Sequence, residues 1–254
     1  MLVHDILYLF LRRMKEEKRL PLTTQEPGYL ETVLTEIAEK ILKEFEQDKA
    51  TGFGILWSLQ KAEMIEDLKG WLKAELGEEG EFLPVYLELP FSCPFPIDGK
   101  EKLSLKGRVD RIDLTPEGRR AKIIDYKTGK HLYLEDGEFK GGEALQLPVY
   151  LYFATSSLLK NMEEVEADYY YVTRRGKYRK APFTLKDWEG KLATLKKIVA
   201  GLVGGIRKGF FVPGLPSCIR CEYPWICGHA AAILYERKSR DPRSEFFERI
   251  KEIP

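Results

Sequence analysis

The sequence predicts an α/β protein in which a mixed β-sheet is flanked by helices, and three observations support this expectation. Long stretches with apolar residues at helical spacing begin the chain and recur in its second half. Shorter stretches alternate apolar and polar residues, as half-buried strands do. Two of these, between Gly107 and Gly129, are joined by a Thr-Pro-Glu-Gly sequence in which Pro116 and Gly118 favour a tight turn and therefore a β-hairpin.

The individual elements can be placed in order along the 254 residues. We expect, in chain order, helices over 2–18, 29–47 and 55–76, a strand over 82–89, the two arms of the hairpin, a helix over 143–159, a strand over 167–173 and a helix ending near Lys208. Thr184 and Asp187 resemble a capping box at the start of the last helix. A segment with three cysteines and a polar tail follow it.

Composition and charge exclude several classes of protein. With 44% hydrophobic residues the chain can bury a full core, which excludes an intrinsically disordered protein. The formal net charge is +1, so attraction to nucleic acid would have to come from the local placement of the 41 Lys and Arg residues. No apolar run approaches the roughly 20 residues of a membrane span, and the first residues lack a signal-peptide pattern. We therefore expect a soluble, cytoplasmic protein.

The hairpin carries the residues with the clearest chemical meaning. Ile123, Asp125 and Lys127 alternate along the second arm and so share one face, and Asp110 lies in the first arm. Two converging carboxylates can bind a hard divalent cation such as Mg²⁺. An adjacent ammonium can orient a water molecule and offset charge on a phosphoryl group. The alternative is a hairpin with two exposed acids and a surface lysine.

Three motifs, "GRVDRID", "IIDYKTG" and "QLPVY", resemble in this order the PD-(D/E)xK nuclease superfamily, and more closely its RecB-like branch. The resemblance implies a restriction-endonuclease-like core and a deoxyribonuclease that depends on Mg²⁺ or Mn²⁺. It implies the metal-binding residues His4, Asp110, Asp125 and Tyr126, and the catalytic residues Asp110, Asp125, Lys127, Gln146 and Tyr150. For Gln146 and Tyr150 a packing role is the alternative to a contact with substrate, and for His4 the alternative is a packed or exposed histidine.

Three clustered cysteines indicate a metal site rather than a disulfide framework. The segment "GFFVPGLPSCIRCEYPWICG", with Cys218, Cys221 and Cys227, resembles the iron–sulfur segment of nucleases in AddB-type helicase-nuclease subunits and in CRISPR-associated adaptation nucleases. The resemblance implies a [4Fe–4S] cluster with four thiolate ligands. The fourth ligand is Cys93 or a residue outside this sequence, or the cluster is incomplete or absent. A Zn²⁺ site of the three cysteines and His229 is the competing interpretation.

A basic run follows the aromatic strand in "ADYYYVTRRGKYRK". Its cationic residues are Arg174, Arg175, Lys177, Arg179 and Lys180. Basic groups neutralise phosphates and aromatic rings stack on unpaired bases, so a groove for single-stranded DNA is one interpretation. A solvated strand end is the other.

We therefore expect a nuclease domain over residues 1–210, with a helical insertion at about 29–80, and a cysteine-rich metal-cluster segment and tail over 211–254. The expected function is hydrolysis of DNA at ends or in single strands, as the nuclease domain of a recombination-repair helicase-nuclease. No Walker-type motif occurs, so the helicase motor would be another domain or subunit. The alternatives are a CRISPR-adaptation exonuclease and, less favoured, a non-catalytic DNA-binding module.

Overall fold

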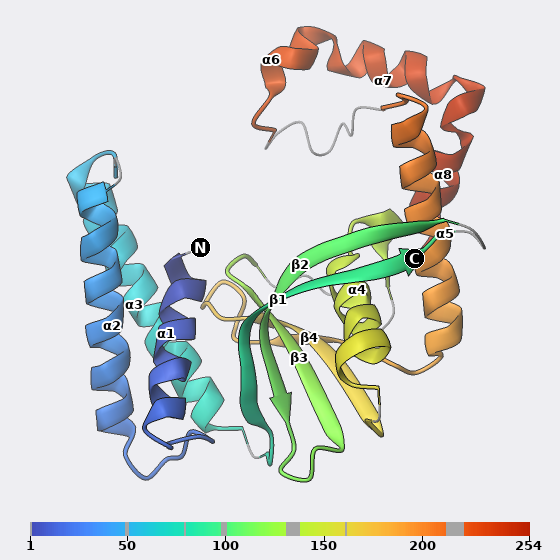
Figure 1. Ribbon diagram of the computed structural model, residues 1–254. Helices are drawn as coiled ribbons and strands as arrows, with labels where there is room; N and C mark the ends of the chain where they lie inside the picture. The colour runs from blue at the N-terminus through green and yellow to red at the C-terminus, as the bar shows by residue number, and fades with distance from the viewer. Residues whose placement is uncertain are drawn as a thin grey trace. The chain divides into compact units, whose positions relative to one another are not determined.

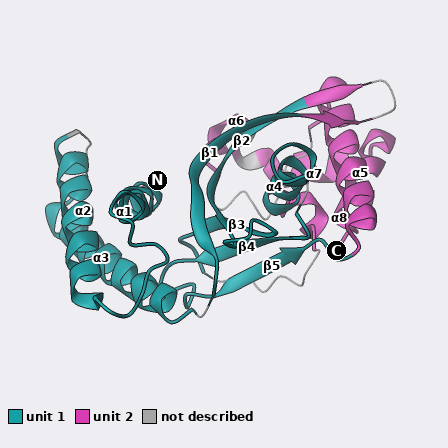
Figure 2. Ribbon diagram, turned by 60° about the horizontal axis from the view of Figure 1, so that its bottom comes forward, with its two compact units in different colours: residues 1–93, 104–137, 146–186 teal, residues 94–103, 138–145, 187–254 magenta. Residues whose placement is uncertain are grey.

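The computed structural model of the chain describes residues 2–48, 51–78, 80–97, 101–130, 138–160, 162–211 and 221–254. Its internal contacts divide the chain into two compact units (Figure 2). The first, unit 1, comprises residues 1–93, 104–137 and 146–186, and the second, unit 2, comprises residues 94–103, 138–145 and 187–254. The domain boundary expected near residue 210 stays a prediction.

A mixed sheet lies at the centre of unit 1, which confirms the predicted fold class (Figure 1). Its strands are β1 (Leu83–Pro96), β2 (Lys102–Leu114), β3 (Arg120–Lys127), β4 (Glu164–Tyr171) and β5 (Lys180–Thr184), and they lie side by side in this order. The β2–β3 and β4–β5 pairs are antiparallel, and β3 and β4 are parallel. β5 is absent from the sequence-based expectation, because its five residues include a proline and are too few to show clear alternation.

The predicted hairpin between β2 and β3 is present. Gly118 adopts a left-handed φ of 66°, and its N–H closes the turn with a 2.8 Å hydrogen bond to the carbonyl oxygen three residues earlier. Across the hairpin, Arg111 pairs with Ile124. Because the two strands are antiparallel, this register places Asp110 opposite Asp125, and residues that lie opposite each other project from the same face.

Three helices cover one face of the sheet (Figure 1). They are α1 (Leu2–Glu16), α2 (Pro27–Asp48) and α3 (Gly54–Leu76). The apolar sides of these helices and of the sheet form one buried core, which includes Ile6, Leu7, Phe10, Leu11 and Met14 of α1, Val33 and Leu34 of α2, Leu68 and Trp71 of α3, and Ile124, Tyr126 and Tyr170 of the sheet. Burial of this apolar surface stabilises the fold and confirms the helical periodicity read from the sequence.

The other face of the sheet is covered by α4 (Gln146–Phe153), which lies between β3 and β4 in the chain and contacts both strands. The helix predicted over 143–159 begins later, at Gln146. It is α-helical to Phe153 and continues as a π-helix over Ala154–Leu158. A helix in this position allows β3 and β4 to run parallel, since parallel neighbours need a long crossover connection. α4 also sets the side of the sheet on which Asp125 and Lys127 lie.

Unit 2 contains α5 (Trp188–Arg207), α6 (Pro224–Cys227), α7 (Ala231–Ser239) and α8 (Glu245–Lys251). The capping box expected at the start of α5 is wrong, because Asp187 adopts a φ of 53° and makes no side-chain capping hydrogen bond. The segment after the cysteines, which the sequence predicts only as a polar tail, includes α8. This helix packs against α5. A Cβ at Gly205 of α5 would lie 2.3 Å from the Phe246 ring of α8, so the glycine permits this close contact. None of the helices within the described residues combines the length and the apolar character needed to cross a bilayer.

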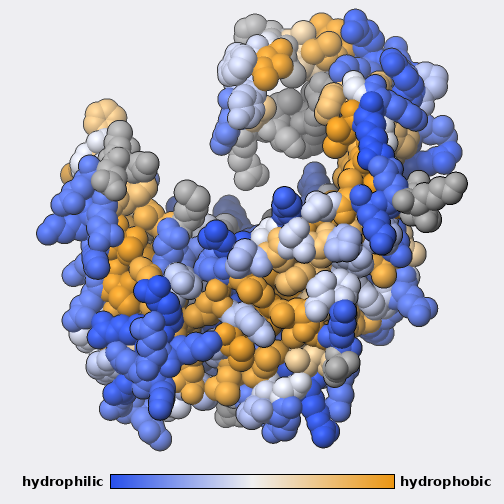
Figure 3. Space-filling view, viewed as in Figure 1, coloured by the Kyte–Doolittle hydropathy of each residue, from blue (hydrophilic) through white to orange (hydrophobic). Residues whose placement is uncertain are grey.

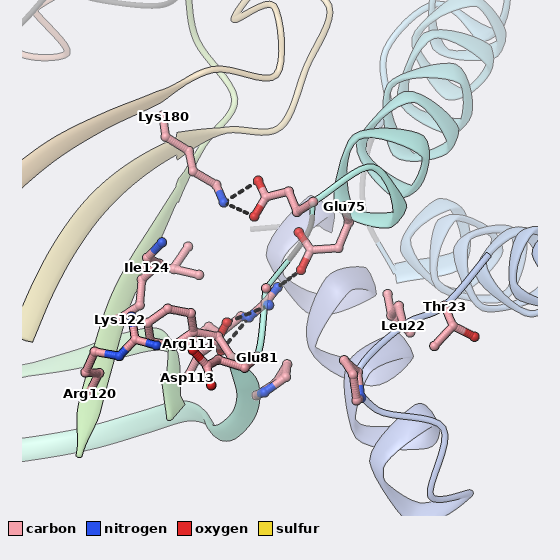
Figure 4. Close-up of a pocket in the computed structure, with 15 residues that line it drawn as sticks. Leu22, Thr23, Glu75, Glu81, Arg111, Asp113, Arg120, Lys122, Ile124 and Lys180 are labelled. Carbon is pink, nitrogen blue, oxygen red and sulfur yellow. Dashed lines mark hydrogen bonds and ion pairs between the residues drawn. The ribbon is translucent and has the colours of Figure 1, made fainter. Parts of the chain in front are cut away.

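A buried ion network joins β2 to α3 on the face that the three helices cover (Figure 4). Arg111 is 5% exposed and donates two 2.7 Å hydrogen bonds to the two carboxylate oxygens of Asp113. Its guanidinium lies 2.6 Å from the Glu75 carboxylate of α3 and 3.4 Å from the Tyr126 hydroxyl of β3. Burial raises the pKa of the Asp113 carboxyl, and the charge of Arg111 opposes that shift. The network therefore connects three elements beside a cavity of about 430 Å³.

Arg111→Met should lower the free energy of unfolding by about 3–5 kcal/mol, because it leaves Glu75 and Asp113 as buried acids without their cation. Urea unfolding followed by circular dichroism measures this change. The matched control is Arg119→Met, since Arg119 and Glu163 form a 3.4 Å ion pair in which both side chains are mostly exposed. The control should cost less than about 1 kcal/mol. Equal losses in the two variants would contradict a stabilising role for the buried network.

Candidate active site

The opposed carboxylates of β2 and β3 meet a histidine from α1. The carboxylate of Asp110 accepts a 2.8 Å hydrogen bond from the backbone N–H of Tyr126, which fixes its orientation beside Asp125. The Nδ1 atom of His4 lies 3.4 Å from Oδ2 of Asp110. Interaction with Asp110 raises the pKa of His4, and partial burial of the ring opposes that shift. The fold thus brings together three residues, His4, Asp110 and Asp125, that the sequence places far apart.

Glu88 is a fourth member of this group, and it is missing from the sequence-based prediction. One ligand atom from each of His4, Glu88 and Asp110 lies within 4.8 Å of the other two. Glu88 sits inside β1 with a left-handed φ of 50°, an uncommon conformation for a residue other than glycine. Burial first, and the charge of Asp110 second, raise the pKa of the Glu88 carboxyl. The only sequence signal was an acid near the end of an apolar strand, which by itself is common.

Asp125 is the most deeply buried acid of the site, with 1% of its surface exposed. Burial raises its pKa to about 6, and the neighbouring Lys127 opposes the shift. The Lys127 ammonium forms an ion pair with Oδ2 of Asp125, yet this oxygen accepts no well-oriented hydrogen bond within the described part of the chain. A divalent cation beside this buried carboxylate would further favour its charged form.

Lys127 is held from its other side by a chain of hydrogen bonds. Its Nζ donates to Oε1 of Gln146 at 2.7 Å, and Nε2 of Gln146 donates to the Tyr150 hydroxyl at 2.8 Å. The Tyr150 hydroxyl in turn donates to the backbone carbonyl of Arg108 at 2.8 Å. Gln146 and Tyr150 share one face of α4 because they are four residues apart. Both therefore line the site, and within this structure they orient Lys127.

Aromatic packing supports this chain of hydrogen bonds. The rings of Phe91 and Tyr150 meet edge to face with centroids 5.8 Å apart. A Cβ at Gly107, the first residue of the "GRVDRID" motif, would lie 2.7 Å from the Phe91 ring. Glycine is therefore needed at this position for Phe91 to reach Tyr150. On the other side, Nζ of Lys127 lies 4.8 Å from the centre of the Tyr169 ring, a favourable cation–π distance.

The donor set fits a hard divalent cation. His4, Glu88 and Asp110 offer one nitrogen and two oxygen ligands at close range, and Asp125 adds a carboxylate directly across the hairpin. Oxygen-rich sets of this kind suit Mg²⁺ or Mn²⁺. The Tyr126 side chain lies on the opposite face of β3, where its hydroxyl accepts a hydrogen bond from Arg111. The metal-binding role predicted for Tyr126 stays a prediction and could be met only by its backbone.

Only some of the predicted cysteine ligands lie within the described residues. Cys218 lies outside the described residues, as do the side chains of Cys227 and His229. Cys221 is exposed, and its sulfur accepts a hydrogen bond of 3.3 Å from the Tyr223 N–H. Cys93 is buried in β1, and burial raises the pKa of its thiol. The cluster itself stays a prediction.

The basic run after β4 is largely exposed, and some of its residues contact α3. Asp67 of α3, which is buried, accepts hydrogen bonds from the backbone N–H of Arg174 at 3.0 Å and from its Nε at 3.2 Å. Arg175 forms an ion pair with Glu63 at 3.5 Å. Lys180 forms an ion pair with Glu78, which follows α3 in the chain. At least three of the five cations are therefore used to attach this loop to the helical layer.

A family model described as the PD-(D/E)XK nuclease superfamily matches residues 1–228. The chain belongs to this superfamily. The mixed sheet between helices is consistent with the restriction-endonuclease-like fold that the resemblance implied. Asp110, Asp125 and Lys127 lie together on one face of that sheet.

Curated relatives of this PD-(D/E)XK chain are named as subunits of an ATP-dependent helicase/deoxyribonuclease. The relative from Alkaliphilus metalliredigens is 31% identical over 167 residues, which are 59% of this chain and 14% of the relative. That from Alkaliphilus oremlandii is 29% identical over 175 residues, 61% of this chain and 14% of the relative. That from Clostridium kluyveri is 37% identical over 90 residues, 32% of this chain and 8% of the relative. The match thus covers about a seventh of the length of the first two relatives.

Glu88→Gln should weaken binding of Mg²⁺ and Mn²⁺ at least on the order of tenfold, since even residues outside the ligand shell change metal affinity by that much. The amide keeps the size of the side chain and removes its charge. Isothermal titration calorimetry measures the affinity, and Glu163→Gln, an exposed acid of the Arg119 pair, is the control. If both variants bind the metals as the wild type does, Glu88 is not a ligand.

Proposed function

We propose that this chain is a metal-dependent deoxyribonuclease domain that hydrolyses phosphodiester bonds of DNA. The observation that carries the proposal is the convergence of His4, Glu88 and Asp110, with Asp125 opposite Asp110 in the hairpin. Asp125 pairs with the Lys127 ammonium, which is held on its other side by Gln146. Acids, one histidine and one lysine in such an arrangement suit hydrolysis of a charged ester. Membership of a nuclease superfamily points to the same chemistry.

His4, Glu88, Asp110 and Asp125 would hold Mg²⁺ or Mn²⁺. Such an ion, when bound, polarises the phosphate and lowers the pKa of a coordinated water. The chain itself provides a rigid frame for that binding, because Asp110 is anchored by a backbone N–H and Asp125 is enclosed between the sheet and α4. The burial that raises the pKa of Asp125 also gives its carboxylate a strong preference for a positively charged neighbour.

Lys127 would stabilise negative charge that develops on the phosphate oxygens. Its ammonium is fixed before substrate arrives by the Asp125 carboxylate, by Gln146 and, through Gln146, by Tyr150. A charge held in place in this way needs little reorganisation during the reaction, which is the main source of electrostatic catalysis. Gln146 and Tyr150 would thus act as positioning residues for Lys127.

We propose further that the domain works with a helicase motor in recombination and repair of DNA ends or single strands. The support is the name of the curated relatives, which combines helicase and deoxyribonuclease. These relatives favour this role over a CRISPR-adaptation exonuclease.

Lys127→Ala should lower kcat on labelled single-stranded DNA by about 10²–10³-fold, the usual effect of removing one group that stabilises transition-state charge. Turnover in the presence of Mg²⁺ or Mn²⁺ is the measurement, with metal affinity recorded in parallel to separate lost chemistry from lost metal. The control is Lys43→Ala on the exposed side of α2. Turnover of the Lys127 variant equal to that of the control would remove Lys127 from the mechanism.

For residues 211–254 we propose a metal-cluster segment, with a [4Fe–4S] cluster as the first candidate and Zn²⁺ as the second. Cys221, Cys218 and Cys227 have the close spacing of cluster ligands, and the sulfur of Cys221 already accepts a backbone hydrogen bond. The proposed role is structural. Metal binding would add to the folding free energy of this segment, because the unfolded chain has no preformed site.

Cys221→Ser should reduce bound metal and increase protease cleavage after about Phe210, because the segment loses the ligand that holds it. Protein purified without oxygen provides the test through its visible absorbance and its iron, sulfide and zinc content. Brown protein with iron and sulfide supports the cluster. Colourless protein with zinc overturns it in favour of the Zn²⁺ site, and metal-free protein with an unchanged cleavage pattern removes the structural role.

A further inference from the structure

A second cavity in unit 1 lies beside the candidate active site and has no part in the chemistry described above. Its volume is about 510 Å³. Side chains of three separate elements line it, among them Leu2 from α1, Phe45 from α2, and Gln60 and Met64 from α3, together with Thr128 after β3. The wall is therefore partly apolar, with an amide and a hydroxyl that can form hydrogen bonds.

The cavity and the site are connected through residues that are adjacent in the chain. Val3 and Thr128 line the cavity, and they are the immediate chain neighbours of His4 and Lys127. The carbonyl oxygen of Lys127 accepts a 2.9 Å hydrogen bond from the Val172 N–H, so the end of β3 is firmly paired with the end of β4. A nucleotide adjacent to one whose phosphate contacts Lys127 is therefore a candidate occupant of this cavity.

The wall of the cavity continues along α3 as exposed apolar surface. Leu56, Gln60 and Met64 follow each other at four-residue spacing and so share one side of the helix. Leu56 is 54% exposed, and Phe53, just before the helix, is 78% exposed. Figure 3 shows apolar surface along the flank of the α2–α3 hairpin that faces α1. Large apolar side chains in water need a partner, and a flat unpaired base is a suitable one.

The charged residues that line the cavity are Arg175 and two acids, Glu63 and Asp67. Arg175 lines the cavity and forms a 3.5 Å ion pair with Glu63, in which the arginine side chain is 67% exposed. An exposed pair of this kind contributes little to stability, so a phosphate can replace the glutamate as the partner of Arg175. Asp67, in contrast, is held by Arg174 and keeps the loop attached to α3.

We propose that this cavity binds an unpaired nucleobase of the substrate strand next to the bond that is cut, so that the domain acts on single-stranded DNA. This inference rests on the proposed nuclease function. The base would pack on Leu2, Phe45 and Met64, and its polar edge would meet Gln60 and Thr128. A base within a duplex cannot enter, because its faces are covered by its neighbours and its edge by its partner.

The first experiment moves a single abasic site along a labelled single strand and measures affinity by fluorescence anisotropy in EDTA, where no cleavage occurs. Loss of a stacked base costs roughly five- to 150-fold in affinity. We expect such a loss at one or two positions only, next to the position at which Mn²⁺ induces cleavage of the intact strand. A uniform response at all positions would overturn the proposal.

Variants then assign the effect to the cavity. Met64→Glu should bring the ratio of intact to abasic affinity close to one, because a carboxylate replaces the apolar wall. Ala62→Glu adds the same charge on another side of α3, at an exposed position, and should keep the wild-type ratio. If the two variants show the same ratio of intact to abasic affinity, the base does not bind in this cavity.

A measurement on the unaltered protein covers the case in which Met64→Glu does not fold. A 2-aminopurine at the sensitive position should become brighter on binding, because it leaves the stack of its neighbours, and unchanged emission would count against the cavity. Hydrolysis of bis(p-nitrophenyl) phosphate by the wild type tests the nuclease chemistry separately. Hydrolysis without a position-dependent base effect refutes the cavity alone, whereas a base effect without any hydrolysis refutes the nuclease function and leaves the binding site.

Discussion

The register between β2 and β3 is the constraint on which the rest of the molecule depends. Because side chains alternate along each strand, the pairing of Arg111 with Ile124 puts Asp110 and Asp125 on the α4 face and Arg111 on the face covered by α1–α3. A slip of one residue would exchange the two sets. It would move carboxylates into an apolar core and separate Arg111 from Glu75, leaving buried charges unpaired. The ionic network on one face therefore protects the geometry of the site on the other.

The candidate site concentrates acids in a place where burial disfavours their charge. The pKa values of Asp125 and Glu88 are both raised, and for each of them burial is the first cause. Lys127 provides part of the compensating positive charge. A divalent cation would provide more.

A contact between distant segments connects the helical layer to the strand that carries Lys127. Asp67 of α3 attaches the loop after β4 through Arg174, and this loop is paired with the end of β3 through Val172 and Lys127. The α2–α3 hairpin is therefore coupled to the strand that carries the candidate catalytic lysine.

Much of the site could be predicted from the sequence, because its signals are local. Alternation along β3 places Asp125 and Lys127 on one face, a four-residue interval places Gln146 and Tyr150 on one side of a helix, and Gly118 marks the turn that brings Asp110 across. Each of these relations acts over a few residues and follows from the geometry of a single strand, helix or turn.

The remaining features were decided only by the tertiary structure. Glu88 joins the site because β1 adopts a left-handed φ at that residue and because α1 brings His4 to it. No local pattern marks Arg111 as buried, and its ion pair with Glu75 depends on the packing of α3 against β2. β5 is defined by its pairing with β4, and α8 by its packing against the glycines of α5. These features depend on contacts between distant segments, whose energies outweigh local preference and leave no periodic signal in the chain.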